Sequence, residues 1–158
     1  MFPTRILLAT DGSKEAILAE EAAVELADGT GSELHVVYVV SRVPEFPYPT
    51  SSARERSEAL FERRRLGGLR LLDRRVDRIE DLGGGVTTSY YREGSPERVV
   101  IRLGEEIEAG LIMMGGQRRP WFERIFLGAG FSETVSKRAD RPVLVVSQQG
   151  LSSVTVPG

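Results

Sequence analysis

Residues 111–146 read LIMMGGQRRPWFERIFLGAGFSETVSKRADRPVLVV. The stretch begins with an apolar run, residues 111–114, that stops at Gly115-Gly116, a pattern typical of a strand that is buried on both faces and followed by a turn. The segment 132–139 predicts a helix, and the apolar run 143–146 predicts a second buried strand. The order strand, loop, helix, strand indicates an α/β protein with a parallel sheet.

The loop between the first of these strands and the helix is glycine-rich and long. It contains Gly128-Ala129-Gly130 shortly before the helix, whereas connections of this kind usually have only about 4 to 6 residues. Small residues let a ligand approach the backbone, and the N–H groups at a helix start favour an anion such as phosphate. We therefore expect either a phosphate-binding corner or an ordinary strand-loop-helix connection.

The rest of the chain continues the alternation of strands and helices. Apolar runs that stop at turn residues predict strands, as does the alternating segment 86–92 with its Thr and Tyr residues, and apolar residues three and four positions apart predict helices. These patterns place strands at 6–9, 34–40 and 86–92, and helices at 13–27, 53–82 and 96–109. We predict an α/β fold with five parallel strands and helices on both faces, forming a single domain over residues 1–147 with a polar, frayed tail over 148–158.

Residues 53–82 are highly charged but carry one apolar stripe. The runs Arg63-Arg64-Arg65 and Arg74-Arg75 are compatible with nucleic-acid binding, but acidic residues are interspersed among them. A solvated helix face is therefore the better interpretation. The apolar stripe consists of Leu66, Leu69, Leu72, Val76 and Ile79.

The composition excludes several classes of site. The chain has 158 residues, a net charge of −2 and no cysteine, so we expect neither nucleic-acid binding through bulk charge nor disulfides, thiolate zinc sites or cysteine nucleophiles. His35 is the only histidine, and we expect it to pack on the strand 34–40 rather than to bind a metal. Because no apolar run is long enough to cross a membrane, we expect a cytoplasmic protein without membrane contact.

Asp11 lies in the tight turn after the first predicted strand. In doubly wound sheets, ligands bind at the carboxyl ends of strands where the winding direction reverses. If the strands 6–9 and 111–114 are neighbours, Asp11 faces Gly115 and Gly128 across one cleft. A carboxylate is costly to bury without a partner, so Asp11 either contacts a ligand or caps the first helix.

Four short motifs carry a resemblance to a known family. They are ILLATDGS at 6–13, REGSP at 92–96, LIMMGG at 111–116 and RPVLVV at 141–146. In this order they resemble the universal stress protein family over about residues 4–147. The resemblance implies a Rossmann-like sheet of strand order 3-2-1-4-5, similar to that of the adenine nucleotide alpha hydrolases, and a homodimer.

The dimer is expected to form through the last strand of this sheet. Family members pair through that strand, and an apolar strand at a sheet edge offers unpaired backbone groups to another chain. The corresponding residues here are Val143, Leu144, Val145 and Val146.

One branch of the family binds ATP, and the resemblance implies where such a site would lie. The pattern of that branch is a glycine, two residues, a second glycine, nine residues and a Gly-Ser or Gly-Thr pair. Here Gly115 matches the first position, Arg118 replaces the second glycine, and Gly128-Ala129 stands at the final pair. Arginine cannot adopt glycine's conformations cheaply, but its guanidinium could bind phosphates directly. The implied contacts, with Mg²⁺ accompanying any ATP, are Ala9, Thr10, Asp11, Val39, Met114, Gly115, Arg118, Gly128, Ala129 and Gly130.

Two functional interpretations stay open, and a third is disfavoured. The first is a homodimeric stress-response or signalling domain that binds an adenine nucleotide at this altered site, and the second is a nucleotide-free dimer that acts through protein partners. We do not expect an enzyme, because the chain lacks a Ser-His-Asp set, a cysteine nucleophile and a Walker lysine. Trp121 is a lid over a ligand, a plug of an empty site or a surface contact.

Overall fold

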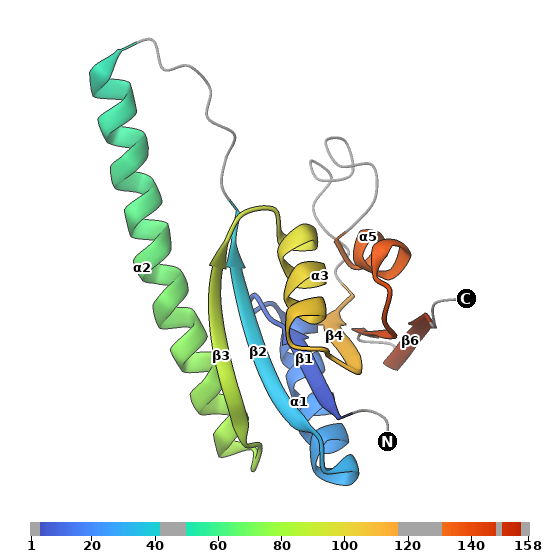
Figure 1. Ribbon diagram of the computed structural model, residues 1–158. Helices are drawn as coiled ribbons and strands as arrows, with labels where there is room; N and C mark the ends of the chain where they lie inside the picture. The colour runs from blue at the N-terminus through green and yellow to red at the C-terminus, as the bar shows by residue number, and fades with distance from the viewer. Residues whose placement is uncertain (1–3, 42–49, 117–130, 148–149, 156–158) are drawn as a thin grey trace.

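Six strands form one sheet in the order β3-β2-β1-β4-β5-β6 (Figure 1). The computed structural model describes residues 4–41, 50–116, 131–147 and 150–155. Within them the elements are β1 (Arg5–Ala9), α1 (Lys14–Thr30), β2 (Glu33–Val40), α2 (Ser51–Asp81), β3 (Val86–Glu93), α3 (Pro96–Glu106), β4 (Leu111–Gly115), α5 (Phe131–Arg138), β5 (Val143–Ser147) and β6 (Gly150–Thr155).

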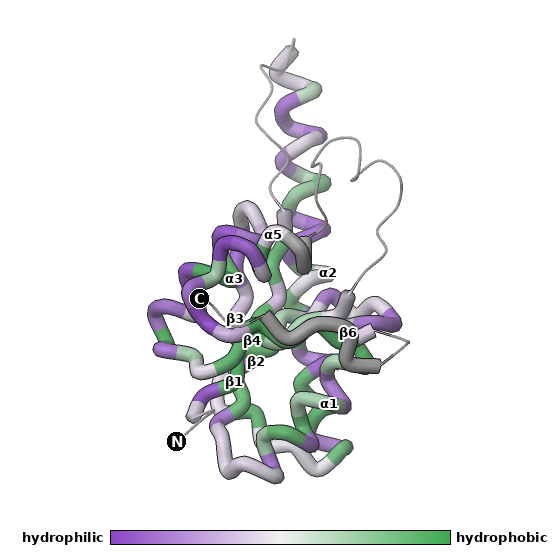
Figure 2. Tube along the Cα trace, turned by 90° about the vertical axis from the view of Figure 1, so that its right-hand side faces the viewer, coloured by the Kyte–Doolittle hydropathy of each residue, from purple (hydrophilic) through white to green (hydrophobic). Residues whose placement is uncertain are grey.

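The predicted parallel sheet of order 3-2-1-4-5 is confirmed. Each neighbouring pair from β3 to β5 is parallel, and helices cover both faces (Figure 1). The alternation of buried residues along the strands produces two cores. Leu8, Val36 and Met113 pack beneath α1 and α2, whereas Leu7, Val37 and Ile112 pack beneath α3 and α5. Figure 2 shows the hydrophobic green segments concentrated in the strands between these layers.

β6 corrects two expectations about the end of the chain. It pairs antiparallel with β5, so β5 is not an edge strand, and residues 150–155 are not a frayed tail. The sequence of this segment, GLSSVT, is short and mixed in character, so it shows neither an apolar run nor a regular alternation that would predict a strand. The residues that were expected to present an apolar edge, Val143, Leu144, Val145 and Val146, are all buried.

α2 is one continuous helix of 31 residues, and only part of it packs on the sheet. Its N-terminal half projects beyond the sheet (Figure 1). Leu72 and Ile79 are buried, but Leu66 is 45% exposed. The apolar stripe of the sequence therefore belongs to the core only in the C-terminal half of the helix.

Gly68 lets α2 approach the sheet closely. A Cβ atom at this position would lie 2.7 Å from Tyr38 Cε1, 3.0 Å from Val40 Cγ2 and 3.1 Å from Tyr91 Cε2. A Cβ atom at Gly67 would have no atom of another part of the chain within 4 Å. A glycine inside a helix costs about 1 kcal/mol relative to alanine, and at Gly68 close packing of the helix on β2 and β3 offsets that cost.

We predict that alanine at these two positions has opposite effects. Gly67→Ala should raise the free energy of unfolding by up to about 1 kcal/mol, because it improves helix propensity without a steric conflict. Gly68→Ala should lower it by roughly 1–3 kcal/mol, the usual cost of overpacking. Urea unfolding of both variants and the wild type measures the two effects, and equal effects would contradict the packing role of Gly68.

Candidate functional site

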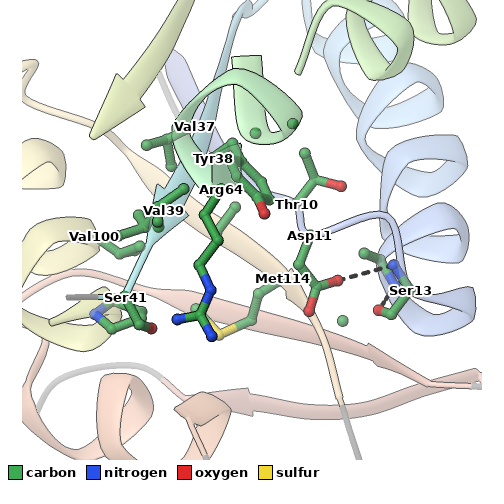
Figure 3. Close-up of a pocket in the computed structure, with 17 residues that line it drawn as sticks. Thr10, Asp11, Ser13, Val37, Tyr38, Val39, Ser41, Arg64, Val100 and Met114 are labelled. Carbon is green, nitrogen blue, oxygen red and sulfur yellow. Dashed lines mark hydrogen bonds between the residues drawn. The ribbon is translucent and has the colours of Figure 1, made fainter. Parts of the chain in front are cut away.

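A pocket of about 480 Å³ opens at the carboxyl ends of β1, β2 and β4 (Figure 3). The winding direction reverses here, because β1 lies between β2 and β4. Ala9 at the end of β1 is opposite Val37 on one side and Met114 on the other. Doubly wound sheets bind ligands at this position. The described lining residues are Ala9, Thr10, Asp11, Ser13, Ala16, Val37, Tyr38, Val39, Val40, Ser41, Arg64, Gly67, Gly68, Pro96, Val100, Met114 and Gly115.

One part of the pocket wall is apolar. Val39 from β2, Val100 from α3 and Met114 from β4 contribute to it. Val100 and Met114 also belong to the core beneath α3, with exposures of 0% and 1%. Met114 is thus a core residue whose side chain also borders the pocket, so its position is fixed by packing before any ligand arrives.

The turn between β1 and α1 supplies a polar part of the wall. Ser13 caps α1, since its Oγ accepts a hydrogen bond from Ala16 N at 3.2 Å. Asp11 Oδ1 accepts a hydrogen bond from Ser13 N at 2.9 Å while the side chain also lines the pocket (Figure 3). Asp11 therefore organises the turn and faces the pocket at the same time. Burial, and then the negative charge of Asp11, raise the pKa of Tyr38, another lining residue.

Gly115 brings the end of β4 against the start of α1. A Cβ atom here would lie 2.5 Å from the carbonyl carbon of Glu15 and 2.6 Å from Ala16 N. Because both are backbone atoms, a side chain could enter only if the first turn of α1 moved. This glycine is therefore required by the packing of the pocket, independently of any ligand.

A buried carboxylate links the pocket to α2. Thr10 Oγ1 donates a hydrogen bond of 2.8 Å to Oε1 of Glu20, whose exposure is 0%. Arg75 Nε and Arg78 Nε approach the two carboxylate oxygens of Glu20 at 3.6 Å, an ion-pair distance that is too long for a hydrogen bond. Burial raises the pKa of Glu20, and the Thr10 hydrogen bond and the two arginines oppose that shift.

The structure brings together every predicted ligand residue that it describes. The four predicted residues of the altered phosphate corner, and Trp121, lie outside the described residues. Three lining residues from α2 were not predicted from the sequence, namely Arg64, Gly67 and Gly68. The only signal was a glycine pair inside a charged helix. The predicted residues found at the pocket are Ala9, Thr10, Asp11, Val39, Met114 and Gly115, and those outside the described ranges are Arg118, Gly128, Ala129 and Gly130.

Comparison with known proteins identifies the family. Residues 3–147 match the family model of the universal stress protein family. The chain belongs to this family. A universal stress protein of Methanocaldococcus jannaschii is 31% identical over 144 residues, which cover 91% of this chain and 82% of that protein.

Solved universal stress proteins share the fold of this chain. The UspA protein from Lactobacillus plantarum is similar with a TM-score of 0.71 and 21% identity, over 90% of this chain and 96% of that one. A universal stress protein in complex with cAMP is similar with a TM-score of 0.65 and 18% identity, over 92% of this chain and 97% of that one.

Two kinds of feature were not found in the described part of this universal stress protein. No group of three or more His, Cys, Asp or Glu side chains there could hold a metal ion. None of the described helices combines the length and the apolar character that crossing a membrane would require.

We predict that Glu20 makes stability depend on pH in a defined direction. A carboxyl whose pKa is raised by folding contributes stability that is fully present below its ordinary pKa of 4.5 and is lost as the pH rises through the folded-state value. The free energy of unfolding of the wild type, minus that of Glu20→Gln, should therefore fall from pH 4.5 towards neutral pH.

Urea unfolding at a series of pH values measures this difference. Glu25→Gln is the matched control, because Glu25 is an exposed carboxylate on the same helix for which the described residues provide no ion pair. A difference between wild type and Glu20→Gln that rises with pH would show that the ion pairs with Arg75 and Arg78 outweigh the burial of Glu20.

Proposed function

We propose that this universal stress protein binds an adenine nucleotide, ATP with Mg²⁺, in the pocket at the ends of β1, β2 and β4. The observation that carries the proposal is the convergence of residues from three strand ends at the reversal point of the sheet, where the family resemblance assigns nucleotide contacts. The volume of about 480 Å³ lies within the range of about 300–1,000 Å³ that is usual for small-molecule sites.

The chemistry of the pocket wall suits the parts of such a ligand. Val39 and Met114 offer apolar surface to adenine, and Asp11 offers a carboxylate to the ribose or to a phosphate-bound Mg²⁺. The phosphates are proposed to reach the segment that contains Arg118 and Gly128-Ala129-Gly130. The structure of a universal stress protein in complex with cAMP supports an adenine nucleotide as the ligand class.

We further propose that the protein binds the nucleotide without turning it over and acts as a stress-response signalling domain in the cytoplasm. Among the described residues that line the pocket, Asp11 is the only carboxylate, and neither histidine nor lysine is present. A positioned histidine, lysine or second carboxylate, the usual groups for acid–base catalysis, is therefore missing from these described residues.

Thermal unfolding with and without Mg-ATP tests the proposal. A ligand at about 100 times its dissociation constant adds roughly 2.7 kcal/mol, a rise of about 5–10 °C for a domain of this size. Val39→Trp fills the apolar part of the pocket, so its unfolding temperature should be the same with and without Mg-ATP. No shift for the wild type would instead favour the nucleotide-free function through protein partners, and an unchanged shift in Val39→Trp would place the nucleotide elsewhere.

We also propose that the protein is a homodimer, as the family resemblance implies. β5 is paired on both sides, so we propose contact through the outer edge of β6, which ends the described sheet and offers unpaired backbone groups. Val145 is 6% exposed within the core, so a charge at this position would disrupt the fold and not the dimer alone.

Light scattering at tens of micromolar measures the oligomeric state. The full chain should be a dimer, and a chain that ends at Ser147 should be a monomer because it lacks β6. A monomeric full chain would contradict the proposed dimer. A truncated chain that is still a dimer would show that β6 does not form the interface and would favour the interface first expected at β5.

A further inference from the structure

Arg64 extends from α2 into the pocket. Figure 3 shows its guanidinium with Ser41 on one side and Asp11 on the other in that view. Among the described residues that line the pocket, Arg64 is the only cation. The sequence pattern had placed this arginine on a solvated helix face, together with its neighbours Arg63 and Arg65.

The packing of α2 explains why Arg64 reaches the pocket. Residues four positions apart lie on the same face of a helix, so Arg64 shares a face with Gly68. Gly68 faces the sheet, against Tyr38 and Val40. Gly68 packs against Val40, the last residue of β2, and Arg64 precedes Gly68 by about one helical turn, where its side chain lines the pocket (Figure 3).

The guanidinium of Arg64 is available to a ligand. Two other arginines on this half of α2 are engaged, since Arg65 bonds Glu62 at 2.7 Å and Arg54 bonds Glu58 at 3.3 Å. Within the described ranges, Arg64 makes no side-chain hydrogen bond or ion pair. Its five N–H donors lie in a pocket of about 480 Å³ that the carboxylate of Asp11 also lines (Figure 3), so a ligand in this pocket can contact both charged groups.

We propose that Arg64 binds a phosphate group of the ligand in this pocket, and that α2 is therefore part of the ligand-binding site. The inference rests on the proposed adenine-nucleotide function and deepens it: the site selects a phosphorylated nucleotide over the neutral nucleoside. A guanidinium forms charge-assisted, often bidentate, hydrogen bonds with phosphate oxygens. Because the side chain is exposed, its contribution should weaken as the salt concentration rises.

Calorimetric titration of the full chain with Mg-ATP and with adenosine tests this role. Arg64→Gln should weaken ATP binding by about tenfold, the loss expected for one hydrogen bond to a charged group that water partly screens, and should leave adenosine binding unchanged. Arg64→Lys keeps the charge but loses the planar fork, so it should fall between the wild type and Arg64→Gln. The matched control is Arg63→Gln, which removes the same charge from an exposed neighbour that does not line the pocket.

The outcomes separate this inference from the proposed function. Equal ATP affinity in wild type and Arg64→Gln, or equal losses in Arg64→Gln and Arg63→Gln, would overturn the role of Arg64 while the nucleotide site stands. If the wild type binds neither ATP nor adenosine, inorganic tripolyphosphate is the remaining probe. Tripolyphosphate binding that is lost in Arg64→Gln would preserve the phosphate role and overturn the adenine ligand, whereas its absence would overturn both.

Discussion

The structure depends on one constraint, the contact between the end of β4 and the first turn of α1. Gly115 makes this contact possible, because any side chain there would enter the backbone of Glu15 and Ala16. With it in place, β1 and β4 pair in parallel with Ala9 opposite Met114, and the chain winds outwards from this pair in both directions. The pocket is the direct consequence, since three strand ends and one helix start meet where the winding reverses.

A second close contact ties α2 to the same site. Gly68 lets α2 pack closely on β2 and β3. The buried Glu20 of α1 pairs with Arg75 in the C-terminal half of α2 and accepts a hydrogen bond from Thr10 in the turn after β1. The packed half of α2 is thus fixed relative to the pocket, while the half that projects beyond the sheet carries Arg64 over the pocket opening. In this universal stress protein the long helix is both a cover for the sheet and a wall of the site.

The sequence predicted those elements of the fold that a pattern within one short segment determines. Apolar runs marked four of the parallel strands, and Thr and Tyr residues marked the strand at 86–92. The same pattern placed Asp11 and Gly115 at strand ends, whereas Val39 and Met114 were assigned to the site only through the family resemblance. β6 was missed because its six residues, GLSSVT, show neither an apolar run nor a regular alternation, although their backbone pairs with β5. Arg64 was missed because the pattern of charges along a helix does not show which strands the helix packs against. Its place at the pocket depends on the close packing of α2 at Gly68 on β2 and β3.

One pocket, bounded by the strand ends and by α2, is proposed to receive the nucleotide. Amide chemical shifts of the ¹⁵N-labelled protein during titration with Mg-ATP test it most directly. Saturable shifts are expected at Thr10, Asp11, Val39 and Gly115, together with the turn of α2 that contains Arg64 and Gly67. Saturable shifts confined to another surface, or no saturable shifts at millimolar ATP, would contradict it.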